Sequence, residues 1–218
     1  MADDVTPDGC PVEVYRHLPA GDEPGLIHRA VPPGSRILEL GCGTGRLANA
    51  LVALGHDVTG VDESAAMLSH LDGVTPVHAR IEDVRLGERF DVVLLAANLI
   101  SAAADRRALA QACARHLIPG GTLVGQWLRP SWFDELIRDG GRDGRLGAVH
   151  GSVRLVRSAA EELTAEMTYR IDSRVWRQRF TAHRISAAQL RSDLAGAGLW
   201  LDRWLDERRT WWSAVRRT

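Results

Sequence analysis

The stretch from residue 36 to residue 47 constrains the fold of this chain more than any other. Its first part, Arg36 to Leu40, has the length and apolar character of a buried parallel strand. A helical spacing of apolar residues follows over residues 46–55. Between them lie three closely spaced glycines: Gly41, Gly43 and Gly45. A strand, a glycine loop and a helix in this order let the backbone approach a nucleotide-like ligand closely, so we expect an α/β fold with a ligand site here.

The rest of the chain predicts a doubly wound, Rossmann-like sheet of seven strands. Four more apolar runs are expected as parallel strands: 58–61, 74–79, 89–96 and 122–128. Helices are expected at 12–18, 24–30, 105–117 and 131–138, with one more capped by Ser64 and another running from Ser186 to Ala195. Strands that alternate with helices indicate a parallel sheet. Residues 199–205 and 211–215 are expected to close it as an antiparallel hairpin.

The character of the sequence changes after Leu128. Three alternating segments predict an inserted antiparallel β meander, preceded by a glycine- and arginine-rich loop that ends at Gly147: 148–157, 163–171 and 174–184. The expected organisation is an N-terminal cap segment (1–34), a central domain (35–128 and 186–218) and an inserted substrate lid (129–185).

The glycine spacing separates two kinds of nucleotide site. A dinucleotide fingerprint reads G-x-G-x-x-G, but Arg46 occupies the position of its third glycine. Glu39 lies two residues before the first glycine, which gives the pattern E-x-G-x-G-x-G. This pattern resembles motif I of the class I S-adenosylmethionine-dependent methyltransferases, and the closing hairpin is similar to the end of that fold. The central domain is then a methyltransferase domain. A nicotinamide or flavin site and a glycine turn without a ligand are the alternatives.

The resemblance implies S-adenosylmethionine as the cofactor and a set of residues that bind it. The carboxylate of Asp62, at the end of the second strand, would accept both ribose hydroxyls, because it has two acceptor oxygens and no donor; helix capping is its alternative role. The carbonyl of Ala96 would face the methionine ammonium. The family usually has an acidic residue where this chain has Arg80, to accept from the adenine amino group. The expected cofactor-binding residues are Tyr15, Glu39, Gly41, Cys42, Gly43, Gly45, Asp62, Glu63, Met67, Ile81, Glu82 and Ala96.

The implied reaction is methyl transfer to a nitrogen, oxygen or carbon nucleophile of a small molecule, in specialised metabolism. A sulfonium is already an activated methyl donor, so the protein has to align the acceptor and exclude water. We expect Tyr15 and His150 as catalytic residues. The acceptor is expected to contact polar and aromatic side chains: Asn98, Trp127, Trp132, Tyr169 and Trp176. A cyclase of the same fold that retains the cofactor, and a non-catalytic interaction module, are the alternatives.

Composition excludes several other kinds of chemistry. All 27 basic residues are arginine, which excludes a Schiff-base lysine and a Walker-type phosphate loop. The net charge of −1 gives no electrostatic reason to expect nucleic acid or a membrane as partner. Three scattered cysteines indicate reduced thiols in a cytoplasmic protein, and the histidines lack the spacing of a zinc site. The tryptophans of the C-terminal hairpin are interpreted as core or as a homodimer contact.

Overall fold

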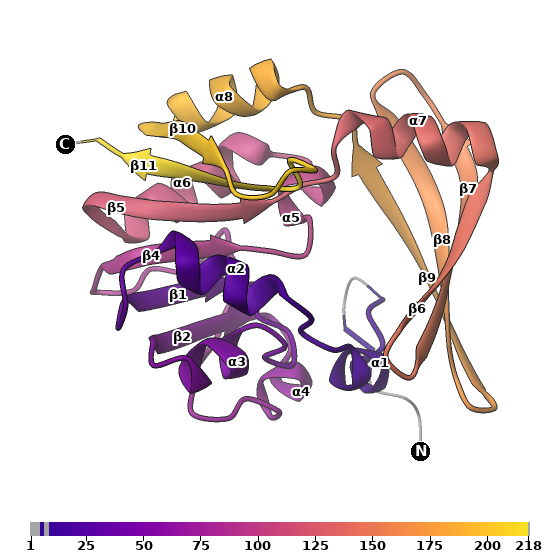
Figure 1. Cartoon of the computed structure of the whole chain (residues 1–218), viewed down its shortest axis with the longest axis horizontal. Helices are drawn as coiled ribbons and strands as arrows, with labels where there is room; N and C mark the ends of the chain where they lie inside the picture. Colours follow the sequence, from indigo (N-terminus) through magenta and orange to yellow (C-terminus); the bar gives the residue numbers. More distant parts are fainter. Residues whose placement is uncertain (1–4, 7–8, 218) are drawn as a thin grey trace.

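The computed structural model describes residues 5–6 and 9–217 (Figure 1). Residues 1–4 and 7–8 of the expected cap segment, and Thr218 of the expected central domain, lie outside the described residues. Within the described ranges, no helix is long and apolar enough to cross a membrane.

The main sheet has seven strands, in the order β10-β11-β5-β4-β1-β2-β3. The strands are β1 (Arg36–Leu40), β2 (Asp57–Asp62), β3 (Thr75–His78), β4 (Phe90–Leu95), β5 (Leu117–Gln126), β10 (Leu199–Trp204) and β11 (Trp211–Arg216). Strands β1 to β5 pair in parallel, whereas β11 is antiparallel to both β5 and β10. The predicted doubly wound sheet with a closing antiparallel hairpin is therefore confirmed.

Helices cover both faces of this sheet (Figure 1). The helices are α1 (Val12–His17), α2 (Glu23–Ala30), α3 (Ala48–Ala53), α4 (Ala65–Leu68), α5 (Leu99–Ala102), α6 (Arg106–His116), α7 (Pro130–Asp139) and α8 (Ala187–Ala195). Of these, α2 and α3 pack on one face of the main sheet, and α6 and α8 pack on the other. Alternate residues of β1 explain the two layers: Leu38 packs into the core cluster of α6 and α8, whereas Ile37 packs into that of α2 and α3. A strand buried on both faces reads as a continuous apolar run, which is why β1 could be recognised.

The chain crosses from one side of β1 to the other between β3 and β4. Strand β1 pairs with β2 on one side and with β4 on the other. A crevice forms beyond the carboxyl ends of the strands at such a point, and ligands of open α/β sheets bind there. A ligand site is therefore expected among the residues that follow β1, β2, β3 and β4.

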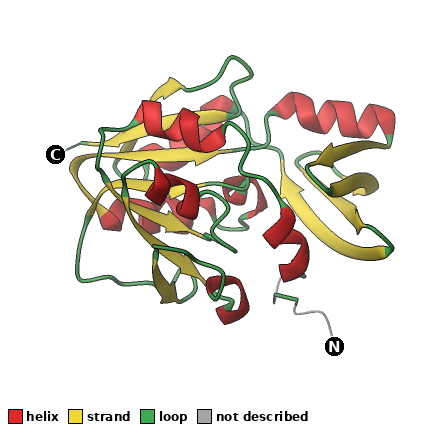
Figure 2. Ribbon diagram, turned by 60° about the horizontal axis from the view of Figure 1, so that its bottom comes forward, coloured by secondary structure: helices red, strands yellow, loops and turns green. Residues whose placement is uncertain are grey.

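A second, four-stranded antiparallel sheet is built from the inserted segment (Figure 2). Its strands are β6 (Gly141–Leu146), β7 (Val149–Ser158), β8 (Glu162–Ile171) and β9 (Arg174–His183). The prediction of a loop up to Gly147 was wrong, because residues 141–146 form β6. Every residue of β6 pairs with β7, and Gly147 closes the hairpin at a φ of +59°, which favours glycine. Glycine and arginine have weak strand propensity, so pairing with β7 decides the structure.

The two faces of the second sheet differ in character. Residues of its inner face contact α7 at one end, through Phe133 and Val153, and α1 at the other, through Val14 and Trp176. Figure 1 shows the same arrangement, with α7 across one end of the sheet and α1 beside the other. Alternate residues point to the outer face, where exposed arginines dominate. The inner face is therefore the one that adjoins the rest of the molecule.

Candidate functional site

The glycine loop after β1 has a backbone that other residues would not readily adopt. Gly41, Gly43 and Gly45 have φ values of +75°, +55° and +81°. The N–H of Gly41 donates to the carbonyl of Val61 at 2.8 Å, which ties the loop to the end of β2. A Cβ on Gly41 would lie 2.7 Å from Leu99 Cδ1, whereas the nearest atom to one on Gly43 would be 4.0 Å away. The loop is thus packed at its start and open at Gly43.

Asp62 connects this loop with the start of α4. Its Oδ2 accepts the N–H of Gly43 at 2.9 Å, and its Oδ1 accepts the N–H of Ser64 at 2.9 Å. Ser64 itself caps α4, because its hydroxyl accepts the N–H of Met67 at 3.3 Å. Each carboxylate oxygen has a second lone pair. Asp62 can therefore hold the loop and still accept two hydroxyl groups.

Glu39 is a buried carboxyl beneath the glycine loop. Only 3% of its surface is exposed, and its Oε2 has no hydrogen-bond partner among the described residues. Burial raises the pKa of Glu39 to about 8, against the opposing effects of Arg46 and of a hydrogen bond from the Ala48 backbone. The Glu39 carboxyl is therefore mostly protonated at neutral pH.

Arg46, which excluded the dinucleotide fingerprint, fastens α2 to the glycine loop. Its guanidinium forms an ion pair with Oε2 of Glu23, the first residue of α2. Oε1 of the same Glu23 accepts the side-chain amide of Gln126 at 2.9 Å, at the end of β5. Glu23 and Gln126 were missed from the sequence, because neither belongs to a recognisable motif.

The end of β3 places charged residues beside Asp62. Arg80 lies within 4.0 Å of three carboxylates, those of Glu63, Glu82 and Asp83. Ile81 points the other way, since its Cδ1 would be 3.5 Å from a Cβ on Gly41. Glu63, Ile81 and Glu82 thus follow β2 and β3, beside Asp62 and the glycine loop.

The end of β4 turns sharply into α5. Ala97 and Asn98 both have positive φ values, +52° and +59°, which are uncommon for residues with a side chain. The carbonyl of Ala96 accepts the N–H of Leu99 at 3.2 Å, so α5 begins immediately. This four-residue helix was not predicted. It brings Leu99 onto the glycine loop and leaves Asn98 half-buried at the crevice.

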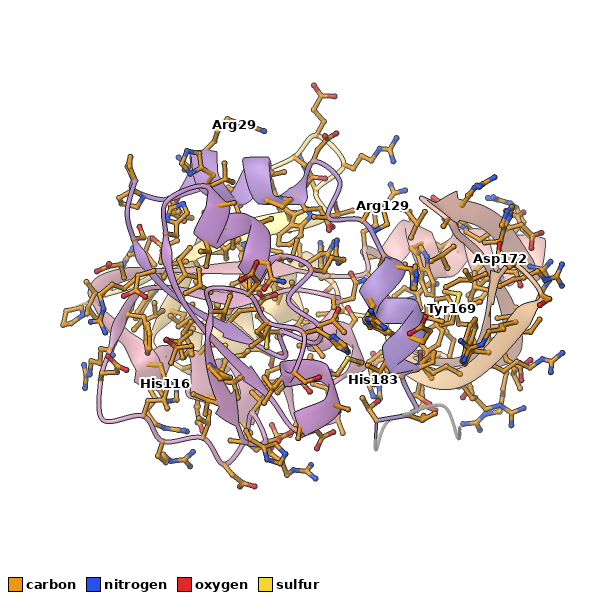
Figure 3. The ribbon with its side chains drawn as sticks, turned by 90° about the horizontal axis from the view of Figure 1, so that it is seen from below. Arg29, His116, Arg129, Tyr169, Asp172 and His183 are labelled. Carbon is orange, nitrogen blue, oxygen red and sulfur yellow. The ribbon has the colours of Figure 1, made fainter. Side chains whose placement is uncertain are left out.

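Tyr15 of α1 joins the glycine loop to the second sheet. Its ring carbon Cδ1 is the nearest atom, at 4.0 Å, to a Cβ placed on Gly43, and its hydroxyl lies 3.2 Å from Cys10 Sγ. Burial raises the pKa of the Tyr15 hydroxyl well above its usual value, and the neighbouring Tyr169 and Cys10 raise it further. Tyr169 lies on β8 beside α1 (Figure 3). Gln178 of β9 donates to Cys10 Sγ at 3.0 Å.

Gln178 and Cys10 were not predicted as site residues. A signal for Gln178 was present, because it is a polar residue at an inward position between Trp176 and Phe180 of an alternating strand. Cys10 gave no such signal. Its role depends on how the N-terminal segment folds back, with Val5 bridging to Pro11.

Two of the predicted site residues, His150 and Trp127, lie away from this site, so these predictions were wrong. His150 is exposed on the outer face of the second sheet, opposite Arg145 and Arg170, because it alternates with the buried Val149. Trp127 is a core residue: it stacks on Trp204 at 5.5 Å and donates to the carbonyl of Arg209.

Other predicted aromatic and sulfur-containing residues act mainly in packing. Trp132 contacts Phe133 edge to face, and Trp176 packs on Val14 beneath the guanidinium of Arg174. Met67 is buried against Cys10 and Val12. Cys42 is buried at the loop, where burial raises the pKa of its thiol.

The residues brought together fit the cofactor that the motif implies. Asp62 has acceptor capacity for a ribose, the loop is open at Gly43, and Glu39, which interacts with Arg46 and Asp62, has a buried oxygen without a partner among the described residues. Tyr15, Ile81 and Ala96 border the same crevice. A nucleoside with a polar, zwitterionic tail matches this set of groups better than a purely apolar ligand does.

Comparisons with known proteins agree with this interpretation. Residues 38–125 match the model of a methyltransferase domain. A dTDP-4-amino-2,3,4,6-tetradeoxy-D-glucose N,N-dimethyltransferase from Saccharopolyspora spinosa is 34% identical over 161 residues, which cover 69% of this chain and 63% of that protein. A ubiquinone biosynthesis O-methyltransferase from Nitrobacter winogradskyi is 32% identical over 45% of this chain and 41% of that protein. The chain thus spans less than two thirds of the length of these curated relatives.

Solved structures resemble nearly the whole chain. A methyltransferase from Streptomyces caelestis superposes with a TM-score of 0.75 at 24% identity, over 95% of each chain, which shows a shared fold. A sugar N-methyltransferase from Streptoalloteichus sp. has a TM-score of 0.72 at 25% identity, over 94% of this chain and 92% of that one. The chain therefore contains a methyltransferase domain of the class I S-adenosylmethionine-dependent family, as its glycine motif predicted.

Proposed function

We propose that this protein transfers the methyl group of S-adenosylmethionine to an amine nitrogen of a small molecule, of the amino sugar type. The observation that carries the proposal is the glycine loop joined through Tyr15 to the inner face of a second sheet. The relatives that share most of the chain support it, since two of them are named for methylation of an amino sugar or of sugar nitrogen. When bound, the cofactor supplies a methyl group activated by a positive sulfur.

In this proposal each part of the crevice has a separate task. Asp62 and Glu63 hold the ribose, the glycine loop allows close approach, and Ala96 and Glu39 lie toward the methionine part. Helix α1 and the second sheet act as the lid, which excludes water and positions the acceptor. Asn98, Tyr169 and Gln178 supply the polar groups of the acceptor pocket.

The absence of a base on the inner face favours an amine. Among the described inward-pointing residues of β7, β8 and β9, none has a carboxylate or imidazole group: Val149, Gly151, Val153, Leu155, Ser158, Leu163, Ala165, Met167, Tyr169, Ile171, Arg174, Trp176, Gln178, Phe180 and Ala182. Tyr15 keeps its proton, because its pKa is raised. An alcohol needs a base to become a good nucleophile, whereas an amine needs only to lose its ammonium proton to water.

A pair of matched acceptors tests this proposal. We expect release of S-adenosylhomocysteine with a deoxyamino sugar nucleotide and at least about 10²-fold less with the analogue that has a hydroxyl in place of the amine. The dependence of kcat/KM on pH should follow the pKa of the acceptor amine. His150→Ala should leave that profile unchanged, because His150 points outward. Equal turnover of the hydroxyl analogue, or loss of activity in His150→Ala, would contradict the proposal.

A further inference from the structure

Arg80 follows β3, next to the proposed ribose site. The N–H of Ala79 donates to the backbone carbonyl of Asp62 at 3.1 Å, and the neighbouring His78 pairs with Asp62 in the sheet. Arg80 is the next residue. The residues that follow β3 therefore lie beside Asp62, and a nucleoside whose ribose is held by Asp62 can extend its base along the Arg80–Ile81 segment.

The guanidinium of Arg80 is exposed and available to donate hydrogen bonds to a ligand. Its side chain is 64% exposed, and its contacts with Glu63, Glu82 and Asp83 are 3.8, 3.7 and 4.0 Å long. At these distances the three contacts are ion pairs but not hydrogen bonds. Ion pairs between exposed side chains contribute little stability. The three carboxylates therefore hold the guanidinium beside Glu63 and leave its N–H donors available to a ligand.

The chemistry of Arg80 differs from that of a carboxylate in one decisive respect. A guanidinium has five N–H donors and no acceptor. It can donate to a ring nitrogen or to a carbonyl oxygen of a base, but it cannot accept from an exocyclic amino group. Glu82, the nearest alternative acceptor after β3, is 58% exposed and lies against Arg80.

We propose that Arg80 contacts the nucleobase of the cofactor and makes the site tolerant of a 6-oxo base in place of adenine. The inference rests on the proposed function, because it requires that the crevice bind a methionine-linked nucleoside. Arg80 is then a specificity-determining residue, because at this position the protein only donates hydrogen bonds to the base and accepts none.

Calorimetric binding of two ligands tests the proposal: S-adenosylhomocysteine and S-inosylhomocysteine, which differ at position 6 of the base. We expect the two dissociation constants of the wild-type chain to lie within about threefold of each other, because Arg80 can donate to either base. Arg80→Asp should favour the adenosyl ligand by at least about tenfold, since a carboxylate accepts from the amino group. Arg80→Ala should shift the ratio in the same direction by less.

Two controls keep the outcomes distinct. Arg107→Ala removes an exposed arginine of α6 that pairs with Asp193 of α8, and should leave the ratio unchanged. Thermal unfolding establishes that each variant is folded. If the adenosyl ligand binds but the ratio is the same in wild type, Arg80→Ala and Arg80→Asp, the role of Arg80 is overturned and the proposed function stands. If neither ligand binds the folded wild type, both fail.

Discussion

Replacement of Asp62 with alanine is expected to weaken binding of S-adenosylhomocysteine by about 100-fold or more. The substitution removes the acceptor of two ribose hydroxyls, and hydrogen bonds to a charged group contribute about 1.5–3 kcal/mol each. It also releases the N–H of Gly43, which Asp62 holds at 2.9 Å. The lost ligand contacts and the lost hydrogen bond to Gly43 both weaken binding of the ligand. The measurement is the dissociation constant by calorimetry.

Two variants show whether weaker binding results from loss of the Asp62 carboxylate itself or from loss of any carboxylate of this strand. Asp57→Ala removes an exposed carboxylate at the opposite end of the same strand, and we expect no change in affinity. Asp62→Asn keeps one acceptor oxygen and should lie between wild type and Asp62→Ala. Should Asp62→Ala bind as tightly as Asp57→Ala while both are folded, Asp62 has no role in the site.

Glu39→Gln is expected to change how the stability of the ligand-free protein depends on pH. The pKa of Glu39 is about 8 in the folded chain, against 4.5 for an ordinary glutamate. A raised carboxyl pKa contributes stability below the unfolded pKa, and that contribution is lost as pH rises toward the folded one. The wild type should therefore lose about 2 kcal/mol of unfolding free energy between pH 6 and pH 8 through this group.

Glutamine resembles protonated glutamate in shape and stays neutral, so Glu39→Gln should lack this component. The measurement is urea-induced unfolding at both pH values, with the unfolding free energy obtained by linear extrapolation. Glu88→Gln changes an exposed carboxyl and serves as the control, which should keep the pH dependence of the wild type. If Glu39→Gln and wild type lose the same stability between pH 6 and 8, Glu39 is already ionised in the folded chain.

The main sheet could be predicted because its signals are local. Strand β1 is a short apolar run, the glycines require positive φ, and Ser64 and Ser186 cap their helices as expected. Asp62 could be placed because the carboxyl ends of parallel strands share one edge of the sheet.

Other features depend on contacts between distant segments and could not be predicted. Residues 141–146 become a strand only because β7 pairs with them. Trp127 belongs to the core rather than to a pocket because it stacks on Trp204, which lies about 80 residues later in the chain. His150 had a suitable side chain for catalysis, but the register of β7 turns it outward.

Calorimetry with S-adenosylhomocysteine on the intact chain shows whether the glycine loop and Asp62 together bind a methionine-linked nucleoside. We expect binding at one site, an increase in thermal stability on addition of the ligand, and neither effect with NADH. A folded chain that gives no heat with S-adenosylhomocysteine, or that binds NADH equally well, would contradict this expectation.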